Sequence, residues 1–207
     1  MVNYAEPPPS LHASDASAPL RAINESFLEL LIDMAHLPGE PCSDFISTLR
    51  TQIGSLTQAP RAIALRTPVL LVDIEFRNPI WWKAVAATPS RLHAPTSVWL
   101  APPPRARAVK LARAALTLAW HLARTDLESS LVLMGLTAPV IEIVGALQPQ
   151  QLDRIAELQS AHLRPRWEDG PSVWRQLLLG ASIDSHQSRA FALRTLQLTW
   201  ASARAPL

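Results

Sequence analysis

The feature that most constrains this chain is an internal repeat: an ordered series of segments in the first half recurs in the second half. Placing Ile23 on Leu111 also places Leu30 on Leu118. Three further matches follow in the same order: residues 53–56 with 144–147, 72–76 with 163–167, and 78–83 with 170–175. Leucine-rich helices align easily by chance, whereas such an ordered series does not. Because self-similarity at a fixed spacing marks a repeated structural unit, we expect two diverged copies of one unit.

The spacing of apolar residues predicts a mainly helical chain. Ile23, Phe27, Leu30, Leu31 and Met34 form one buried stripe of an amphipathic helix. Similar patterns and helix-stop residues predict helices over residues 22–36, 43–53, 80–87, 106–124, 127–134, 138–144, 150–159, 172–179 and 184–202, and a helical turn at 60–65. Residues 69–76 predict a strand, and residues 162–167 an extended piece. The expected fold class is therefore all-α with short extended segments.

Proline divides the chain into four parts. Residues 1–20 are rich in Pro, Ser and Ala and predict a flexible tail. Residues 89–105 contain five prolines and predict a semi-rigid linker. The first repeat then covers residues 21–88, and the second covers 106–202. The second repeat has an extra C-terminal helix, and we expect the two helical repeats to form an intramolecular pseudo-dimer.

Composition narrows the functional class. The sequence has no run of 18 apolar residues and no secretory signal, so we expect no membrane span. Cys42 is the single cysteine, which excludes an internal disulfide and indicates a cytoplasmic protein; an intermolecular disulfide would need an oxidising compartment.

The two halves of the chain differ in net charge. Residues 1–104 hold 7 Lys/Arg and 9 Asp/Glu, a net charge of −2, whereas residues 105–207 hold 12 Lys/Arg and 8 Asp/Glu, a net charge of +4. The basic second half is permissive for nucleic acid, although an ordinary solvated surface explains it equally well.

Nothing in the sequence predicts an enzyme, a metal site or a cofactor. The six histidines lack paired metal-ligand spacing, and no glycine-rich phosphate loop is present. Ser182, Asp184, Ser185 and His186 contain the residue types of a hydrolase triad. Because these residues are crowded into one helix start, they cannot approach a substrate from different elements. Capping of the last helix by Asp184 and Ser185 explains them better.

Four tryptophans stand at matching places in the two repeats: Trp81, Trp82, Trp167 and Trp174. One interpretation is a stacking platform for single-stranded nucleic acid. Such a platform needs interleaved basic residues, and few are nearby. We therefore expect these side chains to fill the interface between the repeats, where aromatic burial of this size would dominate.

The second repeat resembles the FlhD family of flagellar transcriptional regulators. The segments that carry the resemblance are residues 116–122 (LTLAWHL), 134–136 (MGL), 144–152 (VGALQPQQL) and 162–167 (HLRPRW). In the first repeat, residues 23–28 (INESFL) are similar to the family's opening INLSYL. The resemblance covers residues 22–88 and about 106–200.

The resemblance implies a function. Members of the family are small helical proteins that form homodimers and pair with a zinc-binding partner, FlhC, in a complex that activates transcription. The tandem chain would then be a covalent pseudo-dimer, since linking two modules gives them an effective concentration on the order of millimolar. It would bind an FlhC-like subunit and contact promoter DNA through that complex. It could also self-associate further.

Two departures from the family concern arginine, the side chain best suited to phosphate and guanine contacts. The family's arginine before its LG turn falls on Leu133, and a second one falls within residues 181–183. The candidate contacts with DNA or a partner are therefore other basic residues: Arg164, Arg166, Arg175, Arg189 and Arg194. The basic residues of the last helix are equally explained as a solvated face. The second functional hypothesis is an interaction module or antagonist that binds a regulatory partner without touching DNA.

Overall fold

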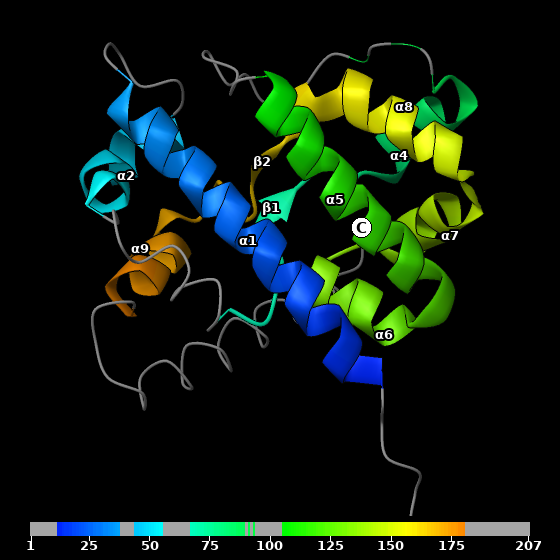
Figure 1. The fold of residues 1–207 in the computed structure, drawn as a ribbon, viewed down its shortest axis with the longest axis horizontal. Helices are drawn as coiled ribbons and strands as arrows, with labels where there is room; N and C mark the ends of the chain where they lie inside the picture. Colours follow the sequence, from blue (N-terminus) through cyan, green and yellow to red (C-terminus); the bar gives the residue numbers. More distant parts are fainter. Residues whose placement is uncertain are drawn as a thin grey trace, which may run out of the picture.

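The computed structural model describes residues 12–37, 44–55, 67–89, 91, 93 and 105–180, which are mostly helical (Figure 1). The first half contains α1 (His12–His36), α2 (Asp44–Gly54), β1 (Val72–Asp73) and α4 (Pro79–Ala87). The second half contains α5 (Arg105–Thr125), α6 (Leu127–Ser129), η1 (Ser130–Met134), α7 (Ala138–Ala146), α8 (Pro149–Gln159), η2 (Ser160–His162), β2 (Arg164–Pro165) and α9 (Pro171–Gly180). The expected helical class with short extended segments is confirmed.

Helices α1 and α5 pack side by side along the middle of the molecule (Figure 1). On one side of this pair, α2 packs on α1 and α9 packs on α2. On the other side, α7 and α8 pack on α5, and α4 packs on α7. The short helix that ends each half therefore packs on a helix of the other half. One continuous apolar core joins residues of both halves.

The two short strands pair with each other and so connect the halves. Strand β1 is antiparallel to β2, with Val72 opposite Pro165 and Asp73 opposite Arg164. Asp73 and Arg164 are also the residues that the repeat alignment places at the same position.

Each strand is followed by a bend of the same kind. Among the described residues, Glu75 (φ 52°) and Trp167 (φ 60°) are the non-glycine residues with positive φ, a conformation that is uncommon for L-residues. Each stands four residues before the proline that opens the next helix, Pro79 of α4 or Pro171 of α9. The bends turn the chain out of the strand pair and into α4 and α9.

Two expectations about local structure were wrong. Residues 12–20, expected within a flexible tail, are the first part of α1. Leu20 is buried in the core, which favours a helix that includes it, and Pro19 is accommodated inside the helix. The strand expected over residues 69–76 has only two paired residues. Leu70 N donates to Leu133 O, Leu71 N donates to Asn24 Oδ1, and the bend at Glu75 ends the pairing.

Other expectations lie partly outside the described residues. The turn at 60–65, most of the 89–105 linker and the last helix at 184–202 belong to this group, as do Arg189 and Arg194. Within the linker, Arg91 and His93 lie against α8 and η2. The Gln159 side chain donates to Arg91 O (2.7 Å) and accepts from His93 N (3.3 Å), and His162 Nε2 lies 3.0 Å from His93 O.

Gly135→Ala is expected to lower the free energy of unfolding by about 2 kcal/mol. Gly135 ends η1 in the left-handed conformation (φ 78°), and a Cβ there would collide with the guanidinium of Arg166. Gly54→Ala is the matched control, because its Cβ would meet His36 Nε2 at an ordinary 3.5 Å. Urea denaturation of both variants measures the difference. Equal midpoints for the two variants would contradict the assigned role of Gly135.

Candidate functional site

The strand pair carries a buried cluster of charged side chains. Arg164 Nε donates to Asp73 Oδ2 (2.8 Å), and its NH2 lies 3.5 Å from Glu75 Oε2. Glu75 is 2% exposed; Asn78 Nδ2 donates to its Oε2 (3.1 Å), and His162 Nδ1 lies 3.7 Å from its Oε1. Burial alone would lower the pKa of Arg164, but the carboxylates of Asp73 and Glu75 outweigh burial and raise it. The cluster therefore joins the two halves by partly buried ion pairs.

Arg166 is held by backbone carbonyls of both halves. Its NH1 donates to Leu133 O (3.0 Å) and lies 3.4 Å from Leu70 O. Its guanidinium lies over the Trp167 ring, 4.8 Å from the centroid. Burial lowers the pKa of Arg166 to about 10, a change that Asp73 only partly offsets. The guanidinium remains a cation near neutral pH, and its NH1 group is engaged by carbonyls within the fold.

Of the five predicted contact residues, the structure describes three: Arg164, Arg166 and Arg175. Arg164 and Arg166 are partly buried and engaged within the chain, so their placement does not support a direct role in DNA contact. Arg175 is exposed on α9. Sequence reasoning identified the charges of these arginines but not the carboxylates and carbonyls that engage two of them.

The four tryptophans lie at or near the contact between the halves. Trp174 of α9 meets the rings of Phe27 and Phe45 edge-on, with centroids 6.3 and 5.3 Å away. Trp81 lies 4.7 Å from the His162 ring, again across the halves. Trp82 is fully buried and stacks on Phe76 of its own half. Trp167 is half-buried beneath Arg166. With three of the rings largely enclosed, a stacking platform for nucleic acid is not available.

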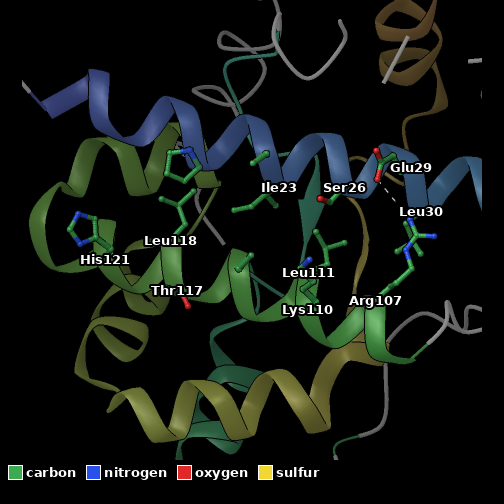
Figure 2. A pocket seen from close by; sticks show the side chains of 13 residues that line it. Ile23, Ser26, Glu29, Leu30, Arg107, Lys110, Leu111, Thr117, Leu118 and His121 are labelled. Carbon is green, nitrogen blue, oxygen red and sulfur yellow. Dashed lines mark ion pairs between the residues drawn. The ribbon is translucent and has the colours of Figure 1, made fainter. Parts of the chain in front are cut away.

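A groove runs along the outer side of the α1–α5 pair and has a volume of about 760 Å³ (Figure 2). Its floor is formed by four aliphatic side chains that meet between the two helices: Ile23, Leu30, Leu111 and Leu118. These are the residues that the repeat alignment pairs, Ile23 with Leu111 and Leu30 with Leu118. The two helices thus contribute corresponding positions to one groove.

The groove exists because the exposed positions above its floor are small. Ala22 and Ser26 on α1 face Ala114 and Thr117 on α5. Sequence reasoning missed this site, since small exposed residues become a groove only when the two helices are known to be neighbours.

The two walls of the groove carry opposite charge. The α1 wall presents Glu29, and the α5 wall presents Arg107 and Lys110. Arg107 pairs with Asp33 and lies 4.0 Å from Glu29 at one end. An apolar floor flanked by one acidic and two basic side chains suits an amphipathic helix with an apolar stripe.

Comparisons of the chain with protein-family models, curated proteins and solved structures find no match. Within the described part of the chain, no single helix is long and apolar enough to cross a membrane; only α6–η1 and α7 taken together pass by length and composition, and they are bent by 113°. The same residues contain no group of three or more His, Cys, Asp or Glu side chains placed to hold a metal ion.

Proposed function

We propose that this protein is an FlhD-like transcriptional regulator in which two repeats of one chain replace a homodimer. It binds an FlhC-like, zinc-bearing subunit, and the complex contacts promoter DNA and activates transcription. The resemblance of both repeats to the FlhD family motivates the proposal. The pairing of Asp73 with Arg164 supports the pseudo-dimer, as do the bends with positive φ that stand four residues before Pro79 in the first repeat and before Pro171 in the second.

The observation that carries the proposal is the groove between α1 and α5. It is lined by aliphatic and small residues of both repeats, with an acidic and a basic wall. A partner helix with an apolar stripe and opposite charges on its two flanks complements it. At the same time, two of the arginines suited to DNA are engaged within the fold. Both points favour a subunit that binds protein directly and reaches DNA through its partner.

The alternative is an antagonist that binds the same partner but does not contact DNA with it. The engagement of Arg164 and Arg166 by Asp73 and by backbone carbonyls favours this second function. Gel-shift titrations of promoter DNA separate the activator from the antagonist. The FlhC-like subunit of the same host is added alone and together with the full chain. An activator complex shifts the DNA and loses affinity steeply as salt rises, whereas an antagonist reduces the shift that the subunit gives alone. If the chain neither binds the subunit nor changes the shift of the DNA, both functions are overturned.

Ala114→Arg is expected to weaken binding of that subunit at least tenfold, because the side chain fills the groove and adds a charge above its floor. Ala114 is exposed, so the fold is expected to remain intact. Ala106→Arg is the matched control: Ala106 is an exposed alanine of the same helix that does not line the groove. Calorimetric titration of the subunit measures both. Equal affinities for the two variants would place the partner elsewhere.

A further inference from the structure

Opposite charges occupy the position where the two repeats meet their own counterparts. Asp73 faces Arg164 across the strand pair, and the two side chains bond at 2.8 Å. The repeat alignment also places acidic Glu75 on basic Arg166. Had the repeats remained identical here, like charge would face like charge.

The same polarity extends to the long helices. Over residues 17–36, α1 carries three acidic residues and one basic residue. Helix α5 carries five basic residues and no acidic one. Arg107 of α5 pairs with Asp33 of α1 across the halves. The two repeats thus carry opposite charges at Asp73–Arg164 and at Asp33–Arg107, whereas Arg77 and Arg166 are like charges near each other between the repeats.

We propose that this charge asymmetry selects the pairing partner: the first repeat pairs with a second repeat and not with another first repeat. The inference rests on the pseudo-dimer in the proposed function. In a dimer of two chains paired like with like, Asp73 would face Asp73 of the second copy, and Arg164 would face Arg164. Buried like charges without a counter-charge are strongly unfavourable, and such juxtapositions are a common source of pairing specificity.

Charge exchange in the full-length chain tests the proposal. Asp73→Arg and Arg164→Asp each place like charges at the strand pair, and each is expected to reduce the folding equilibrium constant about a hundredfold. The double variant Asp73→Arg/Arg164→Asp restores opposite charges and is expected to recover most of that loss. If either single variant does not fold on its own, two other measurements test the proposal: the stability of the double variant, and the refolded mixture of the two single variants described next.

Refolding the two single variants together from urea is the sharper measurement. The first repeat of the Asp73→Arg chain then matches the second repeat of the Arg164→Asp chain, and the converse pair matches as well. Light scattering is expected to show a species of twice the 22.7 kDa chain mass that neither variant forms alone. The wild-type chain refolded alone is expected to remain at the mass of one chain.

Arg113 and Asp153 supply the matched control, because their 2.8 Å ion pair is exposed and lies wholly within the second repeat. The corresponding Arg113→Asp and Asp153→Arg variants should keep the stability of the wild-type chain and remain monomers when they are refolded together.

The proposal is overturned if the double variant Asp73→Arg/Arg164→Asp is no more stable than either single variant, or if the co-refolded mixture of the two single variants contains only monomers. Neither readout involves the FlhC-like subunit or DNA, so failure here leaves partner binding to be judged by the groove variants.

Discussion

Trp174→Ala is expected to lower the free energy of unfolding by about 4 kcal/mol. The indole is 1% exposed, contacts Phe27 and Phe45 of the first half, and donates from Nε1 to Arg166 O (2.7 Å). Truncation leaves a cavity where α9 packs on α2 and removes the donor from that carbonyl. Because a domain is typically stable by only about 5–15 kcal/mol, this single change removes much of the total.

Urea denaturation followed by circular dichroism measures the effect, with Trp167→Ala as the matched control. Trp167 is half-buried at the edge of the core, with the Arg166 guanidinium over its ring, so its loss is expected to cost less, about 1 kcal/mol. Trp174→Phe keeps an aromatic ring and is expected to fall between the two. If Trp174→Ala costs no more than Trp167→Ala, Trp174 does not hold the halves together.

Helices could be predicted from the sequence because their signals are local. The helices expected over 43–53, 80–87, 106–124, 150–159 and 172–179 end within two residues of α2, α4, α5, α8 and α9. Pro79, Pro139 and Pro149 stand in the first turns of their helices, where a missing N–H costs nothing. The start of α1 could not be predicted, because burial of Leu20 in the core is a tertiary effect.

The site could be predicted only in part, since charge and size are visible in a sequence but neighbours are not. The size of Trp174 indicated a place between the halves, and the structure puts it against Phe27 and Phe45. The charge of Arg164 indicated a contact with DNA or a partner, but the carboxylate of Asp73, far away in the sequence, pairs with it within the chain. The groove depends on the packing of α1 on α5, which no local pattern encodes.

Asn24→Ala is expected to lower the free energy of unfolding by about 3 kcal/mol. Asn24 lies in α1 and is 0% exposed, although its neighbours in the core are apolar. Its Nδ2 donates to Val69 O (2.9 Å), and its Oδ1 accepts from Leu71 N (2.8 Å). Alanine would leave both backbone groups buried without partners, and each such group costs about 1–3 kcal/mol.

The segment that Asn24 binds is the approach to β1, so the loss should also loosen the strand pair. Hydrogen exchange is expected to show faster exchange at the Leu71 and Arg166 amides, because Arg166 N donates to Leu71 O in the same segment. Ser26→Ala, an exposed change on the same helix, is the control and should alter stability by less than about 0.5 kcal/mol. Exchange rates at Leu71 that match those of the control would show that the segment is held without Asn24. The strand pair would then be held by its contacts with the second half, among them the ion pairs of Arg164 with Asp73 and Glu75.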